Sequence, residues 1–134
     1  MKGGLSLKIE HLAFTVPDPV AFAAWYEKHL AMRVVRSGAP PINARFLADS
    51  RRETLLEVYN NPKVRPPDYF SMDPLLLHVA FLSDNPEADR DRLLAAGATL
   101  VDDVTVIASG DKLAMLRDPW GVPIQLMKRA APLR

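Results

Sequence analysis

The tetrapeptide His11-Leu12-Ala13-Phe14 recurs 67 residues further along the chain as His78-Val79-Ala80-Phe81. Each copy is followed by the same kind of helix-start signal, Asp18-Pro19 after the first and Asn85-Pro86 after the second. An Asp or Asn cap accepts a hydrogen bond from an otherwise unpaired amide, and a proline in the first turn has no amide to leave unpaired. Self-similarity at a fixed spacing indicates a duplicated structural unit. We therefore expect two related halves, each opening with a strand and a helix.

The segments around these signals extend the repeat over most of the chain. Helices are expected at about 19–30 and 86–96, the second ending at Gly97, a residue that tolerates the positive φ of a helix end. Strand-like segments separated by turn residues follow at 31–35, 43–48 and 54–59 in the first half, and at 97–101, 105–108, 112–117 and 123–127 in the second. The order strand-helix-strand-strand-strand thus occurs twice, with one additional strand-like segment in the second half.

This order predicts an α+β fold in which two βαβββ modules form a curved mixed sheet with the helices outside. We expect one domain over residues 1–134, with module 1 at about 8–60 and module 2 at about 75–128. The stretch between them, about 61–74, contains four prolines and is predicted to be a linker.

Composition and charge exclude several classes of function. The 134 residues have 17 basic and 16 acidic side chains, a balance that predicts no binding to nucleic acid or to an anionic membrane. The absence of cysteine excludes disulfides, zinc-thiolate sites and thiol catalysis. The start of the chain does not resemble a signal peptide, and no apolar run has the roughly 20 residues of a membrane span. A cytoplasmic location is the default expectation.

Four residues with metal-binding side chains fall at repeat-related positions in the middle of expected strands. Because strand side chains alternate between two faces, His11 and His78 should point away from the apolar face that packs on the helix. Glu57 and Gln125, 68 residues apart, occupy equivalent places in the last strand of each half. A lone histidine on a strand is usually a core or surface residue, but two in the same context, each matched by a polar residue of a last strand, favour a metal site.

The chemistry of the set also favours a divalent cation. Glu57 is flanked by Leu55, Leu56 and Val58, and burying an unpaired carboxylate among them would be costly. Two imidazoles, one carboxylate and one amide oxygen form a set suited to Zn, Ni, Co, Mn or Fe(II). We therefore predict a metal held by His11, Glu57, His78 and Gln125, with room for water or substrate.

Four segments of the sequence resemble the metal-ligand segments of the vicinal-oxygen-chelate superfamily, which includes glyoxalase I, methylmalonyl-CoA epimerase, extradiol dioxygenases and bleomycin-resistance proteins. These segments are Ile9–Phe14, Leu56–Asn61, His78–Phe81 and Asp118–Leu126. The resemblance spans about residues 8–128 and is closest to the ligand pattern of glyoxalase I (lactoylglutathione lyase). It implies paired βαβββ modules, a homodimer, and the same four ligands.

Position by position, the resemblance also shows departures. Asn61 matches an asparagine of the family that contacts glutathione. Gln125 stands where glutamate is usual, and Thr15 replaces an arginine that contacts glutathione. The epimerases resemble this set with the amide and the carboxylate exchanged between the halves.

These observations lead to a functional hypothesis: a metal-dependent, glyoxalase-like lyase or isomerase that acts on a small carbonyl compound, with Glu57 as the proton-transferring base. Arg45, Lys112 and Arg117 are candidates for binding an acidic substrate. Two alternatives remain open, a non-catalytic small-molecule binder of the bleomycin-resistance type and a metal-binding paralogue without turnover.

Overall fold

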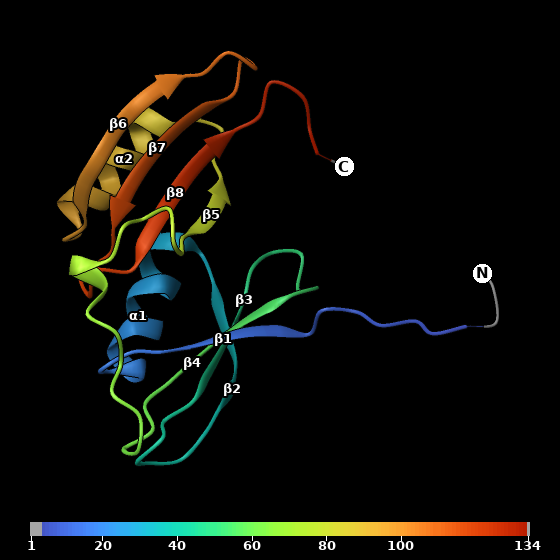
Figure 1. Ribbon diagram of the computed structural model, residues 1–134, viewed down its shortest axis with the longest axis vertical. Coiled ribbons are helices and arrows are strands. Elements are labelled where there is room, and N and C mark those ends of the chain that lie inside the picture. Colours follow the sequence, from blue (N-terminus) through green and yellow to red (C-terminus); the bar gives the residue numbers. More distant parts are fainter. Residues whose placement is uncertain (1–3, 134) are drawn as a thin grey trace. The chain divides into compact units, whose positions relative to one another are not determined.

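A computed structural model describes residues 4–133 and divides into two compact units, unit 1 ending at Pro67 and unit 2 beginning at Asp68. This boundary falls within the stretch predicted to be a linker. Unit 1 contains β1 (His11–Thr15), α1 (Pro19–Leu30), β2 (Arg33–Ser37), β3 (Arg45–Ala48) and β4 (Leu55–Tyr59). Unit 2 contains a 3-10 turn, η1 (Tyr69–Ser71), and then β5 (Val79–Leu82), α2 (Pro86–Ala95), β6 (Thr99–Val106), β7 (Lys112–Arg117) and β8 (Pro123–Lys128) (Figure 1).

The two units have the same topology. The strand order is β1-β4-β3-β2 in unit 1 and β5-β8-β7-β6 in unit 2. In each sheet the first strand runs parallel to the last, and the other pairs are antiparallel. The expected βαβββ order and the α+β class are confirmed. One detail of the prediction is wrong: 97–101 and 105–108 do not form separate strands but belong largely to β6, whose register against β7 shifts twice. Bulges of this kind let one strand continue through residues that disrupt the ladder.

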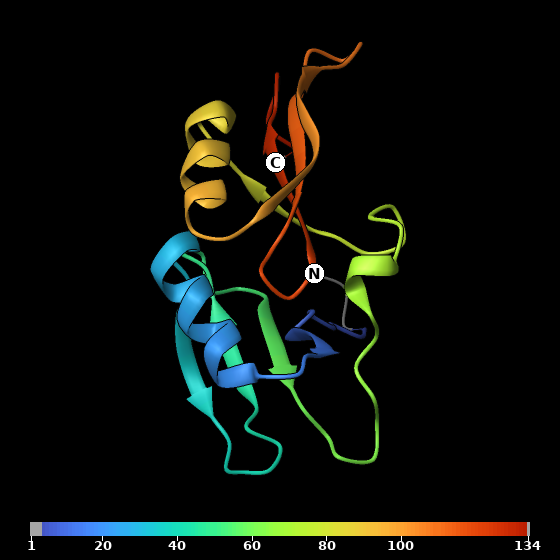
Figure 2. The same ribbon diagram turned by 90° about the vertical axis from the view of Figure 1, so that its left-hand side faces the viewer.

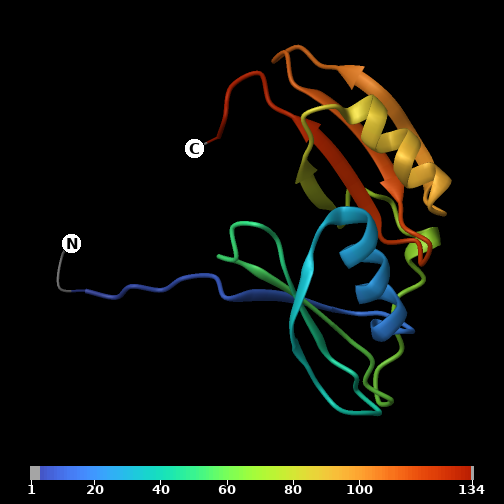
Figure 3. The same cartoon turned by 180° about the vertical axis from the view of Figure 1, so that it is seen from behind.

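Each helix begins as the sequence predicts. The Asp18 carboxylate accepts a hydrogen bond from the Ala21 amide and the Asn85 side chain accepts one from the Ala88 amide, with proline next in both helices. Each helix lies along one face of the sheet of its own unit (Figures 2 and 3). The helices therefore leave the opposite face of each sheet to the polar residues.

The core of unit 1 lies between α1 and the sheet. Phe22 and Tyr26 are fully buried and stack at 4.2 Å between ring centroids, and Phe14 meets Phe22 edge-on at 5.9 Å. Leu12, two residues before Phe14 on the edge strand β1, is 51% exposed. The core of unit 2 lies in the same place beneath α2 and is formed by Leu93, Ala114, Leu116, Ile124 and Leu126.

No helix in the described range, 4–133, has the length and apolar character needed to cross a membrane.

Candidate metal centre

In unit 1 the fold brings one imidazole and one carboxylate together on the face opposite α1. Ala13 pairs with Glu57 between the parallel strands β1 and β4, so His11, two residues before Ala13, lies diagonally across from Glu57 on the same face. The distance from His11 Nε2 to Glu57 Oε1 is 3.5 Å. Both side chains are accessible, with 36% of the His11 side chain and 20% of the Glu57 side chain exposed. This pair is therefore open to a small ligand.

A second carboxylate fixes the His11 ring. Glu10 Oε1 lies 2.8 Å from His11 Nδ1, and the Phe46 ring packs edge-on against the imidazole at 5.4 Å. An ionised carboxylate only accepts hydrogen bonds, so Nδ1 carries a hydrogen and Nε2 is the ring nitrogen that faces Glu57. With the imidazole neutral, Nε2 and the Glu57 carboxylate are two acceptors 3.5 Å apart, and a cation held by both would remove their repulsion. The residues present in unit 1 thus fit a metal ion, and the carboxylate-imidazole contact is the usual outer support of such a ligand.

Glu10 is not among the predicted site residues, and its side chain is 79% exposed. Its contact with His11 was missed because neighbouring residues on a strand point to opposite faces. The carboxylate reaches His11 from just before the strand, where alternation no longer applies. The one available signal was the adjacency of an acid and a histidine, which is too common to indicate a site.

Unit 2 offers an equivalent but uncharged pair. Ala80 pairs with Gln125 between β5 and β8, so His78 stands two residues before the partner of Gln125, as His11 does with respect to Glu57. The carbonyl oxygen of Pro74 lies 2.8 Å from His78 Nδ1. A carbonyl only accepts, so Nδ1 donates and Nε2 is again the nitrogen left to bind a metal. Both His78 and Gln125 are partly exposed.

Within either unit, no three His, Asp or Glu side chains of residues 4–133 gather in a metal-binding group. Each unit supplies two of the four predicted ligands, His11 and Glu57 from one and His78 and Gln125 from the other. The convergence of all four on one ion stays a prediction.

The basic residues expected to bind an acidic substrate have structural partners. Arg45 Nη1 donates to the carbonyl oxygens of Gly38, Asn43 and Ala44. Lys112 donates to Glu87 at 2.7 Å, a hydrogen bond that lowers the pKa of the Glu87 carboxyl. The Arg117 guanidinium donates to the carbonyl oxygens of Tyr69, Met72 and Gly121 and so holds η1 against the turn before β8.

Strand register places two of these three basic side chains, Arg45 and Lys112, on the sheet faces opposite Glu57 and Gln125. Phe46 pairs with Glu57, so Arg45 points to the opposite face of the sheet. Met115 pairs with Gln125, and Lys112, three residues earlier, lies on the opposite, α2-facing side. The Asn61 side chain accepts from the Lys63 amide at 3.0 Å and shapes the turn after β4. A substrate-binding role for these four residues stays a prediction.

The arrangement of paired βαβββ units with repeat-related donors matches a known family. The family model described as Glyoxalase/Bleomycin resistance protein/Dioxygenase superfamily matches residues 8–126. The chain belongs to this superfamily. Its members commonly bind a divalent metal ion, and small-molecule binding is typical of them. No curated protein sequence matches this chain significantly.

Solved structures show the same fold. The chain is similar to a glyoxalase family protein from Bacillus cereus, with a TM-score of 0.80, 13% identity, and coverage of 98% of this chain and 99% of that one. It is similar to a glyoxalase I mutant from Zea mays, with a TM-score of 0.73 and 20% identity over 92% of this chain but 46% of the maize protein. It is also similar to TnmS3, an antibiotic binding protein from Streptomyces, with a TM-score of 0.71, 18% identity, and coverage of 93% and 98%.

Proposed function

We propose that this protein is a metal-dependent lyase or isomerase that acts on a small carbonyl compound. The observation that supports the proposal is the pair formed by His11 Nε2 and Glu57 Oε1, two atoms of metal-binding groups 3.5 Å apart, with Nδ1 of the histidine already occupied by Glu10. In the proposed centre, His11, Glu57, His78 and Gln125 hold one divalent ion of the group Zn, Ni, Co, Mn and Fe. The proposed ligands include one carboxylate and no thiolate, which suits these ions.

The proposed chemistry is proton transfer next to a carbonyl group. When bound, the metal would polarise a substrate carbonyl and make the neighbouring C–H bond more acidic. The Glu57 carboxylate takes up the proton at Oε1 or Oε2 and returns it to the adjacent carbon. His11 and His78 would hold the ion through Nε2, and the uncharged amide of Gln125 would complete the ligand set or orient a water molecule. Because Glu57 is the one carboxylate among the four, the proposal assigns the base to unit 1.

A second candidate function is reversible binding of a small molecule without turnover. It is favoured by the amide at Gln125, where a catalytic carboxylate would be more usual, and by the fold shared with the antibiotic binding protein TnmS3. The two functions differ in a measurable way, because the binder requires neither a metal nor the carboxylate of Glu57. Homodimer formation and a cytoplasmic location belong to the same hypothesis and are tested by sedimentation and by fractionation.

The metal is tested first, in full-length protein purified without chelator. We expect bound divalent metal in the native chain and a lower affinity in the Glu10→Gln variant, by about 10- to 100-fold, because a neutral amide orients the His11 ring less firmly. Isothermal titration of the metal-free native protein and of the variant with Zn²⁺, Ni²⁺, Co²⁺, Mn²⁺ and Fe²⁺ in turn measures the affinities. Failure of the native chain to bind any of the five ions would rule out the metal-dependent function.

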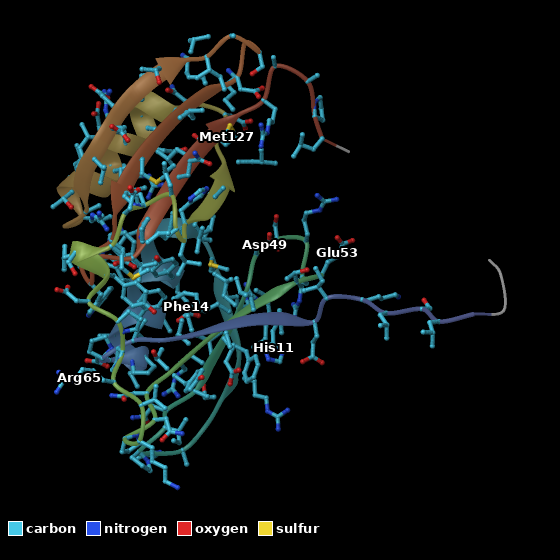
Figure 4. The ribbon with its side chains drawn as sticks, in the orientation of Figure 1. His11, Phe14, Asp49, Glu53, Arg65 and Met127 are labelled. Carbon is cyan, nitrogen blue, oxygen red and sulfur yellow. The ribbon has the colours of Figure 1, made fainter. Side chains whose placement is uncertain are left out.

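The base is tested with Glu57→Gln at saturating metal, on a panel of hemithioacetals and 2-substituted acyl thioesters. We expect turnover to fall by about 10²- to 10⁴-fold, because the amide cannot accept the proton. Glu53→Gln is the matched control, since Glu53 is an exposed carboxylate in the turn before β4 (Figure 4). Equal turnover by native protein and Glu57→Gln would show that Glu57 is not the base, and ligand binding without turnover would favour the second candidate.

A further inference from the structure

A row of paired residues crosses the unit 1 sheet from β1 and β4, which carry His11 and Glu57, to the edge strand β2. Ala13 of β1 pairs with Glu57 of β4, Glu57 with Phe46 of β3, and Phe46 with Arg36 of β2. Paired residues share a face of a sheet, so Phe46 and Arg36 lie on the same face as Glu57 and His11, which we call the donor face because it carries the proposed metal ligands. Arg33 pairs with Ala48, two residues from Phe46, and therefore lies on the same face. Neither arginine could be recognised from the sequence alone, because a sequence does not show which strands are neighbours.

Both arginines are available for a ligand. Arg33 and Arg36 are exposed, and in the portion of the chain that the structure describes neither guanidinium forms an ion pair. By contrast, Arg45 of the same unit is engaged with backbone carbonyls on the opposite face.

The spacing along the row suits one elongated small molecule. Neighbouring strands lie about 4.8 Å apart, so the backbones at Glu57 and Arg36 are roughly 10 Å apart. The Phe46 ring, fixed against His11 at 5.4 Å, occupies the row between them. An extended arginine covers several ångströms of this distance, and a linker of a few carbon atoms over the Phe46 ring would cover the rest.

The corresponding row of unit 2 ends in the opposite charge. Gln125 pairs with Met115, and Met115 pairs with Asp102 of the edge strand β6. An anionic group of a ligand is therefore attracted to the outer end of the unit 1 row and repelled from that of the unit 2 row. The row of unit 1 therefore ends in a cationic residue where the equivalent row of unit 2 ends in an anionic one.

We propose that Arg36, assisted by Arg33, determines substrate specificity by binding a carboxylate of the substrate. The inference rests on the proposed function and names its substrate class: a carbonyl compound whose chelating oxygens lie at one end and whose carboxylate lies at the other, separated by a short carbon chain. Arginine suits this role because its planar guanidinium can bind both oxygens of a carboxylate.

The competing explanation is that charged residues on β2 only prevent edge-to-edge association of sheets, a common property of edge strands. The two explanations make different claims about ligand charge. If Arg36 only prevents edge-to-edge association, ligands with and without a carboxylate should bind alike. If Arg36 binds the carboxylate, the anionic ligand should bind more tightly.

The test uses two hydroxamates of equal carbon number as probes, glutaric monohydroxamate, which ends in a carboxylate, and pentanohydroxamate, which ends in a methyl group. Their dissociation constants are measured by isothermal titration on the full chain loaded with Zn²⁺. We expect the native protein to bind the anionic probe more tightly by about tenfold or more, the gain typical of a charge-assisted hydrogen bond. Arg36→Gln should abolish most of this preference and leave the affinity for pentanohydroxamate unchanged.

Two further variants test whether the loss of preference is specific to the guanidinium group of Arg36. Arg36→Lys keeps the charge and should retain part of the preference, because lysine loses the two-point contact. Arg65→Gln removes an exposed arginine of the loop that follows β4, away from His11, and should leave both affinities unchanged (Figure 4).

The outcomes separate the inference from the proposed function. Binding of both probes with equal affinity, or a preference that survives Arg36→Gln, would overturn the role of Arg36 and leave the metal site intact. Self-association of Arg36→Gln with an unchanged preference would likewise assign the arginine to edge protection. Failure of the Zn²⁺-loaded protein to bind either hydroxamate would overturn the proposed function and, with it, the inference.

Discussion

Glu57 in unit 1 and Gln125 in unit 2 occupy equivalent positions in the last strand of each unit. The histidine diagonally across from each, His11 or His78, is held by a hydrogen bond at Nδ1. The supports differ: a carboxylate, Glu10, holds the first ring, and the carbonyl of Pro74 holds the second. The units thus keep the same backbone and the same imidazole geometry but not the same charge. The comparison teaches that a duplicated scaffold can keep its geometry while one copy loses a charge; under the proposed function, proton transfer belongs to unit 1 and neutral ligation to unit 2.

Exchanging the two side chains tests this division most directly. Glu57→Gln alone should lose about 10²- to 10⁴-fold in turnover through loss of the base. If both positions face one ion, the double variant Glu57→Gln/Gln125→Glu restores the carboxylate to the ligand set, and we expect it to recover about tenfold or more of the lost turnover together with the metal affinity. Steady-state kinetics and metal titration of the native protein and of the single and double variants measure both effects.

The control for this exchange is Gln125→Glu alone, which adds a carboxylate without removing one. It should strengthen metal binding, because a second anionic ligand increases the attraction for a divalent cation. A double variant that binds metal no better than Glu57→Gln would mean that the two positions do not share an ion.

The turns that precede the last strands provide a second contrast, in backbone conformation. Gly121 before β8 has φ +93°, and a Cβ there would lie 2.7 Å from Phe70 Cδ2 and 2.8 Å from the Phe70 amide nitrogen. Arg52 before β4 has φ 58° and nevertheless carries a side chain. We expect Gly121→Ala to lower the free energy of unfolding by about 2–4 kcal/mol through strain and the clash with Phe70. Arg52→Gly should change it by no more than about 1 kcal/mol.

Urea denaturation measures both changes, and Gly4→Ala is the matched control because nothing lies within 4 Å of the added carbon. A Gly121→Ala variant as stable as the control would show that η1 moves aside at no cost and that the close approach of Phe70 is not required.

Each of these turns is also built on an aspartate. Asp118 Oδ1 accepts from the amides of Trp120 and Val122, both at 2.9 Å, and Asp118 is fully buried. Asp49 Oδ1 accepts from the amides of Arg51 and Arg52 at 3.0 and 3.1 Å but is exposed. Asp118→Ala should therefore cost about 2–3 kcal/mol of unfolding free energy, because it leaves the buried Val122 amide and the partly buried Trp120 amide without their acceptor. Asp49→Ala should cost about 0.5–1 kcal/mol, since water replaces the lost acceptor.

Thermal unfolding followed by circular dichroism compares the two aspartate variants under one set of conditions. Equal losses of stability would contradict the assignment of the larger effect to burial and would point instead to the shared geometry of the turns.

Much of the fold follows from local sequence signals. The repeated tetrapeptide and the Asp-Pro and Asn-Pro starts predict both helices and the βαβββ order, and alternation within β1 correctly separates His11 from Phe14. Strand order is not a local property, because pairing β1 with β4 joins residues more than forty positions apart. Without that order, Arg45 and Lys112 could not be assigned to the faces opposite the donors, and Arg36 could not be recognised on the donor face. Glu10 was missed for a different reason, because its contact is made from outside the strand.

The loops that join the second and third strands of each unit differ in the sign of the charge that holds them, and this gives the smallest effect we predict. In unit 1, the Arg45 guanidinium binds the carbonyl oxygens of Gly38 and Ala44. In unit 2, the Asp111 carboxylate accepts from the Ala130 amide at 2.8 Å and from the Ser109 hydroxyl at 3.0 Å, and it pairs with Arg129 at 3.0 Å. The hydrogen bond from the Ala130 amide, followed by that from Ser109, lowers the pKa of the Asp111 carboxyl.

Because the pKa of Asp111 is lower in the folded than in the unfolded chain, its contribution to stability is full above the unfolded value of about 3.9 and is lost as the pH falls through the folded value. Arginine does not titrate in this range. Acidification from pH 7 to below 4 should therefore speed amide hydrogen exchange at Ala130, after correction for intrinsic rates, and leave the Gly38 amide, which bonds to the Ala44 carbonyl, as the internal reference. Asp111→Asn should remove the pH dependence at Ala130. Equal acceleration at Gly38 and Ala130 would mean that acid loosens the whole protein and that the opposite charges in the two loops have no separate consequence.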